Sequence, residues 1–145
     1  MTSRIETVGR PGTSAWLTGT GLLRAALRLD ALVTGVNGLA YLVLAGPLGE
    51  LFDMPEPLLR WLGAFLALFA AAVWLTATPQ KPAAGAVLAV IAVNALWVVD
   101  SVVLLVTGAY EPSTVGSVWI GLQALTVAGL TGLQLAGRAR ARAAC

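Results

Sequence analysis

The chain has no histidine, a single cysteine and few charged residues, which make up 11% of its 145 positions. The cysteine is Cys145, so neither an internal disulfide nor a metal site of Cys and His can form. The sequence also lacks a Gly-rich phosphate-binding loop and a nucleophile placed beside a base. These absences argue against an enzyme, and we expect no catalytic residue, metal or cofactor.

Apolar residues dominate instead. They make up 58% of the chain, and the mean hydropathy is +0.84. Soluble domains carry about 25% charged residues, more than twice the share here. The net charge is +2, but the basic residues flank apolar runs instead of forming a face, so no nucleic-acid partner is expected. The composition predicts a protein embedded in lipid.

Charge-free stretches divide the chain into four segments near the ~20 residues that a helix needs to cross a bilayer. Isolated strands would leave backbone groups unpaired in lipid, so we predict an all-α, four-helix transmembrane bundle with an amphipathic N-terminal lead-in. The expected parts are a disordered tail over 1–13, a membrane domain over 14–137 and a basic tail over 138–145. The spans are expected at about 29–49, 58–78, 83–107 and 114–137. Turn or cap signals separate them: Gly46-Pro47, Pro57, Thr78 to Pro82, Gly108, and Ser113 or Thr114.

The distribution of Lys and Arg predicts the orientation. All basic residues except Arg60 fall on one side of a four-span hairpin, and the acids Glu50, Asp53, Glu56 and Glu111 fall on the other. Both termini are therefore expected in the cytoplasm of a bacterial inner membrane. Arg24 and Arg28, in the lead-in, are expected to meet lipid headgroups.

Asp100 is a lone carboxylate within an apolar run, and such a charge is costly in a membrane unless it has a function or a partner. Counting at 1.5 Å per residue puts Asp100 at the depth of Asn37 and Gln123, and Asn94 lies about one and a half turns further in. Arg60 is the candidate partner of Asp100, because its long side chain could reach inward from the start of span two. We predict a ligand- or ion-binding seam formed by Asp100, Asn37, Asn94, Gln123, Tyr41 and Trp97.

A second polar level, nearer the cytoplasmic side, is predicted from Asp30 and Gln134. The alternative for both levels is interhelical hydrogen bonding without function, which is favoured for the amides and for Asp30. Small residues recur on spans two and four and suggest close packing or association into an oligomer; they are Gly63, Ala67, Ala71, Ala124, Ala128, Gly132 and Ala136.

Several segments carry a family resemblance: LRLDALVTGVNGLAYLVLAGPLGELF, EPLLRWLGAFLALFAAAVWL, NALWVVDSVVLL and GLQALTVAGLTGLQ. They resemble a group of small bacterial integral membrane proteins, many of them from high-GC actinobacteria, over most of residues 22–136. The short first span, the loop after it and the entry to span two are also similar in layout to DoxX-like four-helix proteins. The resemblance implies a four-span bundle and transfers no functional residue.

These observations predict a non-enzymatic membrane protein that holds a small apolar ligand, a lipid or a partner helix against its polar seam. The alternative is a small oligomeric transporter or proton pathway that uses Asp100. Under either interpretation, the expected partners of the protein are membrane lipids and either further copies of itself or a larger membrane complex. A membrane enzyme is the least favoured class, because proton transfer needs positioned groups and only Asp100 and Asp30 are candidates.

Overall fold

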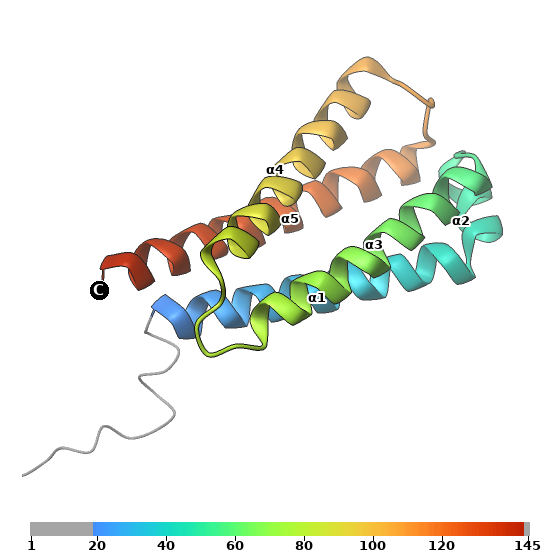
Figure 1. Ribbon diagram of the computed structural model, residues 1–145. Coiled ribbons are helices and arrows are strands. Elements are labelled where there is room, and N and C mark those ends of the chain that lie inside the picture. The colour runs from blue at the N-terminus through green and yellow to red at the C-terminus, as the bar shows by residue number, and fades with distance from the viewer. Residues whose placement is uncertain (1–18, 144–145) are drawn as a thin grey trace, which may run out of the picture.

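The computed structural model describes residues 19–143, and every regular element in that range is a helix (Figure 1). The helices are α1 (Gly19–Val43), α2 (Ala45–Phe52), α3 (Glu56–Ala77), α4 (Ala84–Thr107) and α5 (Thr114–Ala143). All except α2 are long and apolar enough to cross a membrane, which confirms the predicted all-α bundle. The expected tail over 1–13, the start of the lead-in and Cys145 lie outside the described residues.

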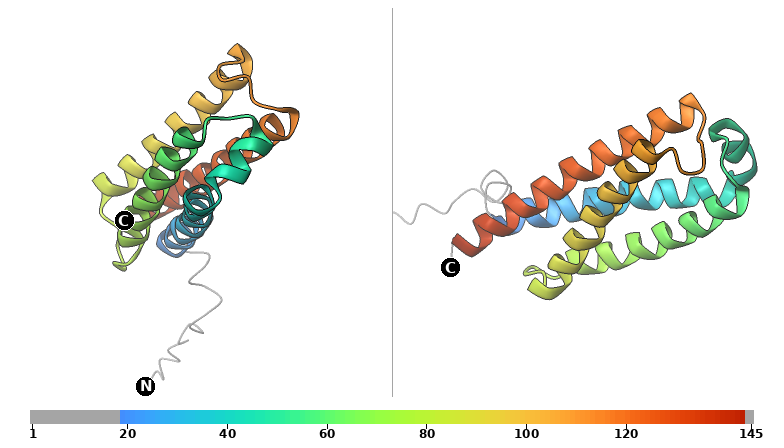
Figure 2. Two further views of the ribbon diagram at one scale, coloured as in Figure 1. Left: turned by 90° about the vertical axis from the view of Figure 1, so that its right-hand side faces the viewer. Right: turned by 90° about the horizontal axis from the view of Figure 1, so that it is seen from above.

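The four long helices pack in the spatial order α3, α1, α5, α4. α1 lies between α3 and α5 along much of its length, and α4 packs on α5 (Figure 2). α3 and α4 meet only near the loop that joins them, and their other ends diverge (Figure 1). We call the end where α1 starts and α5 stops the basic end, because Arg24, Lys81 and Arg138 lie there. The opposite end, which carries α2, is the acidic end.

The first span ends earlier than the sequence predicts. Instead of one helix over 29–49, α1 stops at Val43, and Leu44 leaves the helical conformation with φ −111° and ψ 24°. A separate short helix, α2, then begins at Ala45. The cause is Pro47, which has no backbone N–H to donate to the carbonyl of Val43. Residues 19–28 are continuous with α1, so this part of the expected lead-in is the first part of the spanning helix.

The start of α3, the end of α4 and the start of α5 match their sequence signals, whereas α5 continues past the expected end at 137 through the basic segment to Ala143. Pro57 lies in the first turn of α3, and Gly108 ends α4 in the left-handed conformation with φ 69°. Ser113 caps α5, because its Oγ accepts a hydrogen bond from the backbone N–H of Gly116 at 3.1 Å. The same hydroxyl donates to the carbonyl of Leu51 at 2.7 Å, so the cap also fastens α5 to α2.

Glycines allow α1 to approach both of its neighbours closely. A Cβ atom on Gly38 would lie 2.7 Å from the backbone nitrogen of Ala67, and one on Gly137 would lie 2.7 Å from that of Leu23. The small residues Gly63 and Ala67 of span two therefore serve packing inside the bundle. On α5, by contrast, a Cβ on Gly132 would meet nothing within 4 Å.

The outer surface of the bundle is apolar. Large hydrophobic side chains on all four long helices are mostly exposed, among them Val36, Leu68, Leu96, Val106 and Leu125. A soluble monomer rarely exposes so much contiguous apolar surface, whereas acyl chains would cover it in a bilayer. The fold is that of a multi-pass membrane protein.

Candidate functional site

Among residues 19–143, the carboxylate of Asp30 on α1 is a fully buried polar group, with an exposed fraction of 0%. It accepts three hydrogen bonds from three helices. Asn94 of α4 donates through Nδ2 to Oδ2 at 2.6 Å, and Gln134 of α5 donates through Nε2 to the same oxygen at 2.7 Å. Thr34, one turn along α1, donates to Oδ1 at 3.1 Å. We call these four residues the Asp30 cluster.

Every hydrogen bond within the Asp30 cluster is donated either to the carboxylate of Asp30 or to the amide oxygen of Gln134. Nδ2 of Asn94 also donates to Oε1 of Gln134 at 3.3 Å, so both of its amide hydrogens are used. Within residues 19–143, the ion pair formed is that between Arg60 and Glu56, and no cation pairs with Asp30. A buried charge normally has a counter-ion, and here amide and hydroxyl donors take that place.

A second polar group lies nearer the acidic end. The hydroxyl of Tyr41 donates to Oε1 of Gln123 at 3.2 Å and accepts a hydrogen bond from Nε1 of Trp119 at 2.9 Å. The Trp119 ring in turn stacks on Phe52 of α2, with centroids 6.0 Å apart. This chain of contacts joins α1 to α5 and ends on the short helix. We call Tyr41, Gln123 and Trp119 the tyrosine cluster.

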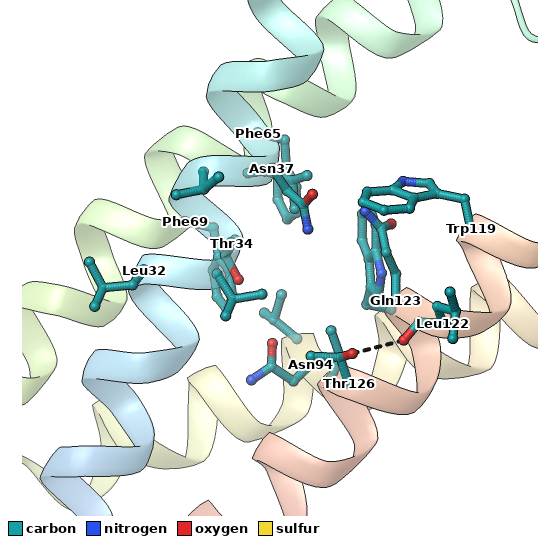
Figure 3. Close-up of a pocket in the computed structure, with 16 residues that line it drawn as sticks. Leu32, Thr34, Asn37, Phe65, Phe69, Asn94, Trp119, Leu122, Gln123 and Thr126 are labelled. Carbon is teal, nitrogen blue, oxygen red and sulfur yellow. Dashed lines mark hydrogen bonds between the residues drawn. The ribbon is translucent and has the colours of Figure 1, made fainter. Parts of the chain in front are cut away.

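A cavity of about 420 Å³ separates the two clusters (Figure 3). Thr34 and Asn94 of the Asp30 cluster line one end of it, and Gln123 and Trp119 line the other. Its walls are largely apolar and aromatic, with Phe65 and Phe69 from α3 and Trp97 from α4; the rest of the lining is Leu32, Val33, Val36, Asn37, Leu66, Val93, Leu122, Thr126 and Val127. All four long helices contribute. Ligand pockets in proteins are about 300–1,000 Å³ and mostly apolar with a few polar groups, as here.

Two amides in this cavity have unused hydrogen-bonding groups. Nε2 of Gln123 is buried and has no partner within the described part of the chain. The side-chain amide of Asn37 points into the open space in Figure 3 and forms no hydrogen bond with any residue from 19 to 143. An unpaired buried donor costs about 1–3 kcal/mol, so a bound molecule with an acceptor would relieve this cost.

The structure therefore brings Asn37, Asn94, Gln123 and Trp97 to one cavity, with Tyr41 bonded to Gln123. The seam does not centre on Asp100, and this part of the expectation is wrong. Asp100 is exposed on α4 and does not line the cavity; it lines an adjoining small hollow of about 70 Å³ nearer the acidic end, which shares Trp97, Trp119 and Gln123 with the cavity. Its suggested partner, Arg60, pairs with Glu56 one turn before it on α3. Asp100 lies six residues after Asn94, which turns it to another side of α4.

The two arginines expected at headgroups have structural contacts. Nε of Arg24 donates to the carbonyl of Ala77 at 3.1 Å, and its guanidinium also reaches the carbonyl of Thr78 at 3.3 Å. Arg24 therefore caps the end of α3, where a cation is favourable. Arg28 is exposed and lies over the ring of Trp74, with Cζ 5.8 Å from its centroid. The Arg28 guanidinium thus lies on the outside of the bundle, against Trp74.

Sequence reasoning missed three contributors: Thr34, Trp119 and the Phe65/Phe69 pair as cavity walls. Thr34 could have been found, because it follows Asp30 by one helical turn and lies on the face shared by Asn37 and Tyr41. No known protein family, characterised protein or solved structure matches this chain. The site is therefore interpreted from its own geometry.

Proposed function

We propose that this protein is a non-enzymatic, multi-pass membrane protein that binds a small amphiphilic molecule in the cavity between the Asp30 cluster and the tyrosine cluster. The proposal places it in a bacterial inner membrane with its basic end toward the cytoplasm, following the positive-inside rule. Acyl chains or other apolar bodies would lie along the aromatic walls, and the polar part would bond to the cavity amides.

The observation that carries this proposal is the unpartnered Nε2 of Gln123 beside an apolar cavity of about 420 Å³. An interface that served only for packing would pair this donor or exclude it from the bundle interior. The Asn37 amide on the facing wall adds a second group free to bond. Amides orient a ligand through hydrogen bonds, which suits binding more than proton transfer.

Tryptophan quenching in nanodiscs tests the proposal directly, because Trp97 and Trp119 line the cavity. The protein would carry Phe in place of its other tryptophans, Trp16, Trp61 and Trp74. Titration with a terminally brominated, medium-chain alkanol should quench the remaining fluorescence in a saturable way. The joint variant Asn37→Leu/Gln123→Leu should remove the saturable part and leave only the linear quenching caused by probe dissolved in lipid.

A matched control is Thr107→Val, which changes an exposed hydroxyl that bonds only to its own helix and the turn after it. It should quench like the parent protein. Linear quenching in the parent, identical to that of the joint variant, would refute binding in the cavity. Mass spectrometry of the detergent-purified protein would then show whether a lipid or a second copy occupies this region.

The transport alternative depends on a pathway through Asp100. Its carboxylate is exposed and lies outside the cavity, so we favour binding over transport. Proton flux into liposomes that Asp100→Asn abolishes would reverse this preference.

A further inference from the structure

The cavity has two chemically different ends, and this difference indicates which head group its ligand carries. At the end nearer the basic side, Thr34 donates its only hydroxyl hydrogen to Asp30. Asn94 uses both amide hydrogens on Asp30 and Gln134. Both residues line the cavity, and what they can still offer there is oxygen lone pairs. This end of the cavity can therefore accept hydrogen bonds but not donate them.

The opposite end has the reverse character. Oε1 of Gln123 is occupied by the Tyr41 hydroxyl, and Nε2 is the group left without a partner. This end can donate a hydrogen bond. A ligand that satisfied both ends would place a donor near Thr34 and Asn94 and an acceptor or π face near Gln123.

The charge of Asp30 lies directly behind the accepting end. Two residues of the cavity lining are hydrogen-bonded to it, Asn94 at 2.6 Å and Thr34 at 3.1 Å. No cation pairs with Asp30 among residues 19–143, and charges inside membranes usually have one. The walls add four aromatic rings, of which Phe65 and Phe69 stack with centroids 6.0 Å apart. Aromatic faces attract cations, particularly where water is excluded.

We propose that the ligand is a lipophilic amine whose protonated nitrogen lies at the Thr34–Asn94 end of the cavity, within the field of Asp30. Its apolar body lies along the aromatic walls toward Gln123. The ammonium group donates to the oxygens of Thr34 and Asn94 and supplies a positive charge, which no residue from 19 to 143 pairs with Asp30. This inference rests on the proposed function and specifies the chemical class of its ligand.

Three probes of equal chain length test it: an n-alkylamine, the n-alkanol and the n-alkanoate. Each would compete with the brominated alkanol in nanodiscs of zwitterionic phosphatidylcholine, corrected for partitioning into protein-free nanodiscs. Charge-assisted hydrogen bonds are roughly twice as strong as neutral ones, so the amine should bind about tenfold more tightly than the alkanol. The alkanoate should bind most weakly, because Asp30 repels it.

The variant Asp30→Asn should reduce amine affinity to the alkanol level and change alkanol affinity by less than about twofold, since the amide keeps the volume of the acid. Asp100→Asn, which removes an acid outside the cavity, should keep the amine preference. If Asp30→Asn does not fold, Thr34→Val provides the second test, because it removes one accepting oxygen and should weaken the amine more than the alkanol.

Saturable alkanol binding with no preference for the amine would overturn this inference while the proposed function stands. A preference that survives in Asp30→Asn would also overturn it. If none of the three probes competes and the brominated alkanol itself does not saturate, both the inference and the proposed function fail.

Discussion

The hydrogen bond between Asn94 and Asp30 should contribute more to stability than is usual between membrane helices. Interhelical hydrogen bonds in membrane proteins average about 0.6 kcal/mol, because the separated helices also find partners. Here the acceptor is a fully buried carboxylate and the distance is 2.6 Å. Hydrogen bonds to charged groups contribute about 1.5–3 kcal/mol. A double-mutant cycle of Asp30→Ala and Asn94→Ala should therefore give a coupling energy of about 1.5–3 kcal/mol.

The assay is reversible unfolding in mixed micelles, with the free energy measured for the parent, both single variants and the double variant. A second cycle, Tyr41→Phe with Gln123→Leu, provides the comparison. It removes a neutral hydrogen bond of 3.2 Å between α1 and α5, and should give about 0.6 kcal/mol. Equal coupling energies in the two cycles would refute the view that Asp30 acts as a buried charge held by its donors.

Three further outcomes follow from the packing. Gly38→Ala should cost about 1–3 kcal/mol in unfolding free energy because its Cβ would collide with the backbone of α3, whereas Gly132→Ala should cost nothing measurable. Arg24→Gln should lower stability by about 1 kcal/mol through loss of the charged cap on α3, and a loss below about 0.3 kcal/mol would show that water replaces it. Asp100→Asn should lower stability by no more than about 0.5 kcal/mol, because Asp100 forms no hydrogen bond or ion pair with any residue from 19 to 143; a larger cost would mean that it has a partner outside these residues.

Much of this fold could be predicted because a span in lipid must satisfy its own backbone hydrogen bonds, which restricts it to a helix of about 20 apolar residues. Charge-free lengths, Pro57 and Gly108 place α3 and α4 to within about two residues at each end, and Ser113 places the start of α5. The end of α5 is not predicted, because the helix continues through the expected basic tail to Ala143. The difference at α2 has a local cause: Gly46-Pro47 is typical of the end of a span, but proline is also compatible with the first turn of a new helix. The sequence contains both possibilities, and the contacts of α2 with α3 and α5 decide between them.

The depth of the polar residues along their helices could be predicted from the sequence, but the side of α4 that faces the bundle could not. Depth counting placed Asn37 and Gln123 together correctly, because depth along a helix follows from residue number. It could not tell which side of α4 faces the bundle, since α4 is apolar nearly all round. That rotation decides whether Asn94 or Asp100 is buried. It also brings Asn94 to Asp30, two residues that residue counting places at different levels.

The polar cluster and the cavity arise from the same crossing of two helices. α1 and α5 approach most closely at the basic end, where Gly137 lets the backbone of Leu23 come near, and one to two turns further on this crossing brings Gln134 against Asp30. Beyond that point the two helices diverge (Figure 2). At the acidic end α2 fills the space between them, fastened to α5 through Ser113. The break at Pro47 is therefore part of how the bundle forms its cavity: a first helix that continued straight would carry no α2 to hold the far ends apart.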